Sequence, residues 1–235
     1  MSNLKKATSL DTDGSNNYPL RGGKFGNCEG GVRVNGLVGG GALPAAQRGT
    51  KTSAFVAVED FYPTFCAIAG VDPRDERAAA AGLPPVDGVN QWPLISGTAT
   101  ASLRNEVVIG TNDGNLTVVQ GLINATSGWK LLLGSVYPSW FQSPQYPNAS
   151  STEQPTLECG ATGCLFNVLT DPTEQNDVSS QHPSEVAALG VRIAALQAGV
   201  YNPFRGGGDA GRPANERICE AGLTLHGGFV GPFLP

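Results

Sequence analysis

The stretch Tyr18-Pro-Leu-Arg-Gly-Gly-Lys-Phe-Gly-Asn-Cys-Glu-Gly-Gly-Val-Arg-Val-Asn-Gly-Leu-Val38 is the part of the chain from which its organisation is read. It opens on a proline turn, places Lys24 behind two glycines and continues through Glu29-Gly-Gly31. Glycine has no Cβ, so the backbone around it can come close to a bulky or anionic group. No acidic residue lies between Lys24 and Glu29, which suggests a loop where a ligand oxygen could sit. Lysines on glycine-rich connections are more often simply solvated.

The composition is that of a globular protein with many ordered turns. The 235 residues are 40% apolar and 15% charged, and they include 32 glycines and 17 prolines. Such a content of glycine and proline favours turns over solvated tails. The net charge of -5 comes without a cluster of lysine and arginine, which argues against a nucleic-acid surface. No run approaches the ~18 apolar residues of a membrane helix. We expect neither a nucleic-acid nor a membrane partner.

The cysteines do not all pair within the chain. There are 5 of them, an odd number, so at least one is free or lacks its partner. Cys159 and Cys164 lie close in sequence and could bridge a loop. Cys219 stands in a polar stretch near the end of the chain and has no obvious local partner.

The N-glycosylation motif Asn-x-Ser/Thr occurs at Asn115, Asn124 and Asn148. Three acceptors in one polar half of the chain indicate a secretory history. The first residues, Met-Ser-Asn-Leu-Lys-Lys, do not read as a signal peptide, because no apolar stretch follows them.

Apolar patterning in the first part of the chain predicts a strand over Val32–Val38, apolar enough to be central in a sheet. It predicts a helix over Phe55–Ala69 that ends at Gly70. The apolar stripe of this helix consists of Phe61, Phe65 and Ile68.

The second part of the chain predicts an antiparallel sheet that carries one amphipathic helix, a small α+β unit. The expected strands are 106–111, 116–124, 128–133 and 165–169, with a hairpin turn at 125–127. The helix begins at Pro183, a favoured first helical position, and its apolar stripe continues to Val200.

Five segments, taken in order, resemble the sulfatase family, and the closest likeness is to the arylsulfatase B type. They are Tyr18–Lys24 with Glu29–Arg33, Glu59–Gly70, Pro85–Gly88, Gly128–Leu132 and Leu165–Glu174. The resemblance covers about residues 16 to 200 and implies an α/β fold of the alkaline phosphatase/sulfatase type, here incomplete. Residues 1–98 would be a C-terminal remnant of the large catalytic sheet domain. Residues 99–235 would be a small subdomain with an antiparallel sheet and a helix near 183–199.

The resemblance also implies a chemistry. Enzymes of this family hydrolyse sulfate esters with a formylglycine made from a Cys/Ser-x-Pro-x-Arg motif and hold a calcium ion with aspartates and an Asp-Asn pair. Lys24 matches the family's lysine that contacts the sulfate ester, a task suited to the compact charge of an ammonium. The residues expected to shape the loop around it are Gly22, Gly23, Glu29, Gly30, Gly31 and Arg33.

Two parts of that chemistry do not map onto the sequence. No Cys/Ser-x-Pro-x-Arg motif occurs, and Asp11-Thr-Asp13 does not reproduce the metal-binding pair, so no metal ligand is assigned. We therefore expect a chain that is inactive by itself and holds no calcium alone.

Partners and location follow from the resemblance. The expected partners are a sulfate ester, including sulfated glycans, and the missing N-terminal half. The full-length family is secreted or lysosomal. Two alternatives stay open, a non-catalytic descendant that binds sulfated glycans or a protein, and a truncated gene model.

Overall fold

The computed structural model describes residues 16–110, 118–139, 144–200 and 219–229. The chain divides into two compact units, residues 1–199 and 200–235. The boundary expected near residue 98 stays a prediction. In the second unit, residues 219–224 are helical. Among the described residues, no helix is long and apolar enough to cross a membrane.

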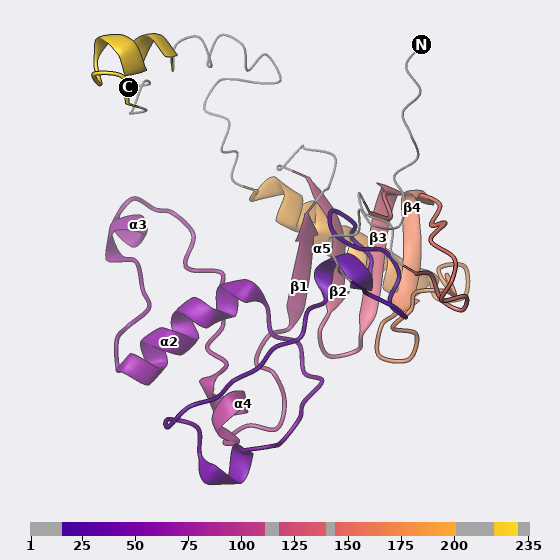
Figure 1. Cartoon of the computed structure of the whole chain (residues 1–235), viewed down its shortest axis with the longest axis horizontal. Helices are drawn as coiled ribbons and strands as arrows, with labels where there is room; N and C mark the ends of the chain where they lie inside the picture. The colour runs from indigo at the N-terminus through magenta and orange to yellow at the C-terminus, as the bar shows by residue number, and fades with distance from the viewer. Residues whose placement is uncertain (1–15, 111–117, 140–143, 201–218, 230–235) are drawn as a thin grey trace. The chain divides into compact units, whose positions relative to one another are not determined.

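The first unit is built on a four-stranded antiparallel sheet with the strand order β1-β2-β3-β4 (Figure 1). Each strand pairs with the next one along the chain, and residues 125–127 form the turn between β2 and β3. The predicted antiparallel sheet is thereby confirmed. The strands are β1 (Glu106–Gly110), β2 (Val119–Asn124), β3 (Trp129–Val136) and β4 (Leu157–Asn167).

The two faces of the sheet carry different layers, because successive side chains of a strand point to opposite faces. On one face, Leu122 and Leu131 are paired in register and are at most 1% exposed. Helix α5 (Pro183–Ala198) packs against β2, β3 and β4 and buries Leu189 and Ile193. The helix predicted near 183–199 is therefore confirmed.

The other face carries a cluster of buried apolar residues. Ile123, Leu132 and Phe166 belong to it, and Cys28 joins it from the glycine-rich segment. The glycine-rich segment is thus packed onto this sheet through Cys28.

Strand β4 starts earlier than expected, at Leu157 rather than at residue 165. Cys159 and Cys164 form a disulfide within it, with Cα atoms 4.9 Å apart. Between them, Gly160 and Gly163 have positive φ angles of 60° and 89°, a conformation that glycine adopts without strain. The suggested bridge between these two cysteines exists, and it spans an irregular part of a strand.

The other helical elements of the first unit are short and are joined by loops. They are α1 (Glu29–Val32), η2 (Ala45–Gln47), η3 (Val58–Asp60), α2 (Phe61–Ala69), α3 (Glu76–Ala80) and α4 (Trp92–Ser96). Asp60 joins several of these segments, since its buried carboxylate accepts hydrogen bonds from the backbone N–H groups of Ala57 and Val89 and from the Arg104 guanidinium. These hydrogen bonds, that of Arg104 above all, outweigh the effect of burial and lower the pKa of Asp60.

Two predictions for the first part of the chain need correction. The strand expected over Val32–Val38 is wrong: Val32 ends helix α1, and the residues after it form no strand. Val34 is 85% exposed and Leu37 98% exposed, because nothing in the described part of the chain pairs with this segment. An apolar, β-branched composition favours a strand only where a partner supplies the hydrogen bonds.

The helix expected over Phe55–Ala69 exists, but α2 proper begins at Phe61, after a turn of 3-10 helix, and Gly70 ends it with a φ angle of 70°. Its apolar stripe is not buried in the described structure: Phe65 is 62% exposed and Ile68 45% exposed.

Candidate functional site

The loop around Lys24 is held against the end of the sheet by its backbone. The N–H of Gly23 donates to the carbonyl of Pro138 over 3.0 Å, and the nearly buried Ser139 hydroxyl donates to the carbonyl of Lys24 over 3.2 Å. The side chain of Lys24 is exposed, with its Nζ 5.7 Å from the ring centroid of Phe25. Lys24 is thus an exposed residue on a loop whose backbone is fixed.

The glycines of this loop lie where backbone meets backbone. A Cβ on Gly30 would stand 2.3 Å from the carbonyl oxygen of Gly22, and one on Gly31 would stand 2.0 Å from that of Gly26. Gly22 itself has a φ angle of 77°. Contacts below 3 Å leave no room for any side chain. The loop is therefore folded back on itself more tightly than other residues would permit.

The two ends of the loop meet at one residue, Glu174. The Arg21 guanidinium donates to the Glu174 carbonyl over 2.6 Å, and the N–H of Glu29 donates to Glu174 Oε2 over 2.6 Å. The N–H of Gly30 closes the base by donating to the carbonyl of Arg21 over 2.7 Å. Glu174 is 0% exposed, so these contacts are shielded from water.

Lys130 of strand β3 supplies the positive charge of this buried cluster. Its Nζ lies 3.0 Å from Glu29 Oε1 and 2.8 Å from Glu174 Oε1. Glu174 Oε1 accepts no hydrogen bond, but its 2.8 Å contact with Lys130 Nζ is an ion pair. Lys130 is 0% exposed and Glu29 3% exposed. When all three groups are ionised, the cluster holds two negative charges and one positive charge.

The environment of the cluster shifts the pKa values of its members. Burial raises the pKa of Glu174 against the opposing effect of Lys130. Burial alone would lower the pKa of Lys130, but Glu174 and Glu29 outweigh it and raise that pKa above its ordinary value. Burial and the nearby Glu174 raise the pKa of Cys28 to about 12. The Cys28 thiol is therefore protonated at neutral pH and is a poor nucleophile there.

Further contacts tie the loop to other parts of the sheet unit. The Asn27 side-chain amide donates to the Gly110 carbonyl over 2.6 Å and to the Gln120 side chain. The N–H of Gly22 donates to Gln154 Oε1 over 2.8 Å. The loop is thus anchored to β1, β2 and the segment before β4 as well as to β3.

The sequence did not reveal the roles of Lys130 and Glu174. Both lie within segments that resemble the sulfatases, but neither was assigned a role there. A signal was present for Lys130, because it stands between Trp129 and three leucines in an apolar strand, and a charge in such a place requires a partner. The sequence gives no comparable signal for its partners, which come from distant positions.

The remaining predicted residues lie apart from this cluster. Arg33 is exposed and is the C-cap of α1, where its backbone N–H donates to the Glu29 carbonyl. Asn124 stands at the β2–β3 turn and Asn148 is exposed. Asn115 and the Asp11–Asp13 segment lie outside the described residues. Within 16–110, 118–139, 144–200 and 219–229, no group of three potential metal ligands comes together.

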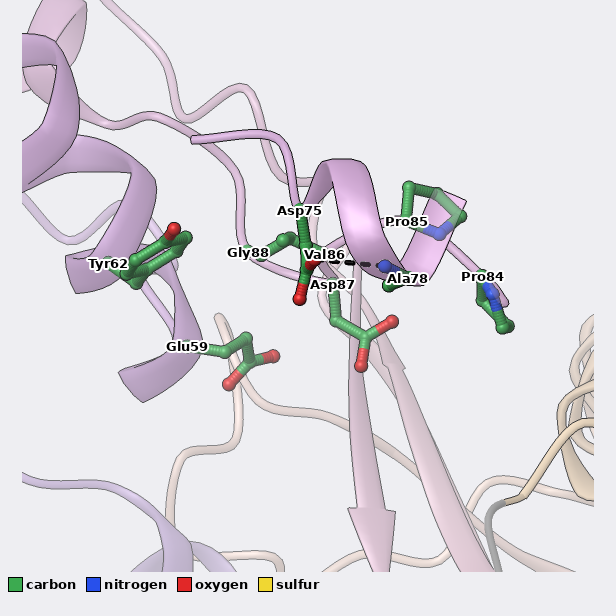
Figure 2. Close-up of a pocket in the computed structure, with 9 residues that line it drawn as sticks. All are labelled: Glu59, Tyr62, Asp75, Ala78, Pro84, Pro85, Val86, Asp87 and Gly88. Carbon is green, nitrogen blue, oxygen red and sulfur yellow. Dashed lines mark hydrogen bonds between the residues drawn. The ribbon is translucent and has the colours of Figure 1, made fainter. Parts of the chain in front are cut away.

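A separate pocket of about 440 Å³ lies beside α2 and α3 (Figure 2). Apolar residues and three carboxylates line it, and none of its lining residues belongs to the loop around Lys24. The Asp75 carboxylate already accepts hydrogen bonds from the N–H groups of Arg77 and Ala78 as the cap of α3. The lining consists of Glu59, Tyr62, Asp75, Ala78, Pro84, Pro85, Val86, Asp87 and Gly88.

Comparison with known proteins identifies the class to which this sheet and its glycine-rich loop belong. The chain belongs to the sulfatase family, and its likeness is to a C-terminal portion of an arylsulfatase, as the sequence predicted. One curated relative is arylsulfatase J of Mus musculus, 31% identical over 199 residues, which are 78% of this chain and 32% of that protein. The chain therefore spans about a third of this relative's length. No protein-family model matches the chain.

Two solved structures are also similar. A sulfatase named PsFucS1 from Pseudoalteromonas sp. is 20% identical with a TM-score of 0.48, over 77% of this chain and 32% of that chain. A Bacteroides thetaiotaomicron protein from a locus for the metabolism of multiple glycosaminoglycans is 18% identical with a TM-score of 0.38, over 59% of this chain and 24% of that chain.

Proposed function

We propose that this chain contributes the sulfate-contacting lysine, Lys24, to the hydrolysis of a sulfate ester. The nucleophile and the calcium ligands would have to come from residues outside this sequence. Relation to an arylsulfatase supports the reaction class. An exposed ammonium on a rigid turn supports the role of Lys24, because a preorganised positive charge stabilises the oxygens of the sulfuryl group and of the leaving alcohol.

The observation that carries the proposal is how the turn is built. Many of the polar backbone groups of the turn are used to fix the loop, and Lys24 lies on it as an exposed residue. A loop that only connected two elements would not need Gly26, Gly30 and Gly31 to lie so close to other backbone that a Cβ on each would stand 2.3 Å or less from a carbonyl oxygen. Fixing a charge in advance is what electrostatic catalysis requires.

Turnover of an aryl sulfate tests the proposal. The purified chain, assayed with p-nitrophenyl sulfate with and without added calcium, is expected to release no phenol. Sequencing the transcript upstream of Met1 is expected to show an in-frame Cys/Ser-x-Pro-x-Arg motif. The longer product that contains this motif should turn over the substrate, and Lys24→Ala should reduce its kcat by about 10²-fold or more. An unchanged rate in Lys24→Ala would contradict the proposed role.

The partner proposed for the chain is the N-terminal half of a sulfatase. The apolar side chains exposed on α2 and at Val34 and Leu37 are those that such a partner would cover, since exposed apolar patches mark sites of association. Because the chain is related to an arylsulfatase, we propose for it the location of the full-length family, secreted or lysosomal.

A second candidate function is binding without catalysis. A stop codon upstream of Met1 in place of the expected motif would favour a protein that binds sulfated glycans through Lys24. In that case Lys24→Ala should weaken binding to a sulfated ligand such as heparin, while Lys51→Ala, on another exposed loop, should leave it unchanged.

A further inference from the structure

We propose that Glu174 is the positioning residue of the Lys24 turn, and that it acts together with Lys130, its buried counterion. By holding both ends of the loop, it sets where the Lys24 ammonium is presented. The inference rests on the proposed function, in which Lys24 contacts the sulfate ester.

The first argument is that Glu174 holds the two ends of the loop together. Arg21 and Glu29 stand on either side of the Lys24 turn, and both donate to Glu174 over 2.6 Å. One residue, distant in sequence, thus fixes the separation of the two ends. Once the ends are fixed, the short chain between them has few conformations left.

The second argument is that the position of Glu174 is set independently of the loop. Its N–H donates to the carbonyl of Asp171 over 3.1 Å, and the Asp171 carboxylate accepts the N–H groups of Gln175 and Asn176 over 3.0 and 2.9 Å. Within this turn Glu174 takes a φ angle of 51°, uncommon for a residue with a side chain. The turn therefore places the carboxylate before the loop docks on it.

The third argument concerns charge. A buried carboxylate without a cation is expelled or protonated, and Lys130, 2.8 Å away, is the group that opposes this. Lys130 is held in the ladder between Ile123 and Phe166, so its position is fixed by the sheet. The same ammonium pairs with Glu29, which joins sheet, turn and loop at one point.

The effect reaches Lys24 through the folded-back backbone. Gly30, at the base, lies against the Gly22 carbonyl so closely that a Cβ would stand 2.3 Å from it. Gly31 lies still closer to Gly26, where a Cβ would stand 2.0 Å from the carbonyl oxygen, and the N–H of Gly26 donates to the Gly23 carbonyl over 2.8 Å. If the base shifts, these contacts with the tip are lost as well.

Amide hydrogen exchange of the full chain tests the proposal. In Glu174→Gln, the Gly23 and Gly26 amides should exchange at least about tenfold faster than in the wild type. Their own hydrogen-bond partners, the carbonyls of Pro138 and Gly23, are untouched by this substitution. The amides of the β2–β3 ladder should keep their rates. If Glu29 alone exchanges faster while Gly23 and Gly26 stay protected, Glu174 is only a local contact and the proposal is wrong.

The matched control is Asp60→Asn, which weakens another buried ion pair, that with Arg104. It should leave the Gly23 and Gly26 amides unchanged. Equal acceleration in both variants would show a general loss of stability and would overturn the proposal.

Should Glu174→Gln unfold the sheet, the wild type supplies the decisive measurement. In a series of low urea concentrations, the Gly23, Gly26 and Glu29 amides should share one opening free energy and one urea dependence, below those of the ladder amides. Separate opening of Glu29 would contradict the proposal.

Binding of p-nitrophenyl sulfate separates this inference from the proposed function. If the wild type binds through Lys24, Glu174→Gln should raise the Kd severalfold and Asp60→Asn should not. An unchanged Kd in Glu174→Gln would overturn the inference. If the wild type shows no Lys24-dependent binding, the proposed function fails, and the exchange data still decide whether Glu174 positions the turn.

Discussion

At the scale of single residues, the glycines of the loop matter because of what they touch. Gly26, Gly30 and Gly31 would each bring a Cβ within 2.3 Å or less of a carbonyl oxygen. Backbone atoms cannot move aside as the end of a flexible side chain can. A Cβ on other glycines of the same segment, such as Gly36, would contact nothing within 4 Å. The effect of adding a Cβ can therefore be compared at crowded and open positions of one short stretch.

Gly30→Ala should lower the free energy of unfolding by about 1–3 kcal/mol, because its Cβ would meet the carbonyl oxygens of Gly22 and Arg21 at 2.3 and 2.5 Å. Gly36→Ala is the control, since a Cβ there meets nothing within 4 Å, and its effect should stay within about 0.5 kcal/mol. Urea unfolding followed by circular dichroism gives both values. Equal effects of the two substitutions would contradict the close packing of the loop.

At the scale of secondary-structure elements, strand β3 combines two tasks. Leu131 faces the layer of α5 and is 0% exposed, while Lys130, its neighbour, points to the opposite face and is also 0% exposed. The strand therefore supplies part of the apolar core and the cation that holds the loop.

Lys130→Met should destabilise the protein by about 3–5 kcal/mol, because it leaves the carboxylates of Glu29 and Glu174 buried without a cation. Arg192→Met is the control: it removes the half-exposed ion pair with Glu106 between α5 and β1, and surface pairs contribute only about 0.2–1 kcal/mol. Thermal or urea unfolding checks both. A loss in Lys130→Met no larger than in Arg192→Met would show that the buried cluster is not a structural anchor.

The same elements show what the sequence could predict. Two strand-like segments on either side of a turn at 125–127 predicted the hairpin, and Pro183 with a helical stripe predicted α5, since both are local patterns. The strand predicted over Val32–Val38 failed because a local pattern does not say whether a pairing strand is present. The cluster of Lys130 with Glu29 and Glu174 could not be predicted, because it joins positions far apart in the chain. The role of Lys24 follows from resemblance and remains a prediction.

At the scale of the whole molecule, Glu174 of the buried cluster and the carboxylates paired with arginine give opposite pH dependences. Asp60 and Glu106 have pKa values lowered by their hydrogen bonds with Arg104 and Arg192, against the opposing effect of burial. Their contributions to stability are lost only when the pH falls below the ordinary range of carboxyl groups. Glu174, whose pKa is raised by burial, acts in the other direction.

A group whose pKa is raised on folding stabilises the fold most fully below its unfolded pKa, and that contribution is lost as the pH rises through the folded pKa. The free energy of unfolding of the wild type should therefore contain a component that falls as the pH rises above 4.5, the ordinary pKa of a glutamic acid. In Glu174→Gln this component should be absent. Urea unfolding of both proteins between pH 4.5 and 8 in the same buffer series gives the difference between their free energies of unfolding at each pH. A constant difference across that range would contradict the assignment to Glu174.

The contact between Lys24 and sulfate is the central claim, and lysine NMR tests it most directly. The chain has lysines at positions 5, 6, 24, 51 and 130, so ¹³C-methylation of the accessible ones gives a spectrum that single substitutions can assign. Titration with p-nitrophenyl sulfate at constant ionic strength should shift the Lys24 signal with saturation and leave that of Lys51 unchanged. Equal, unsaturated shifts of both signals, or no shift of Lys24, would contradict the account.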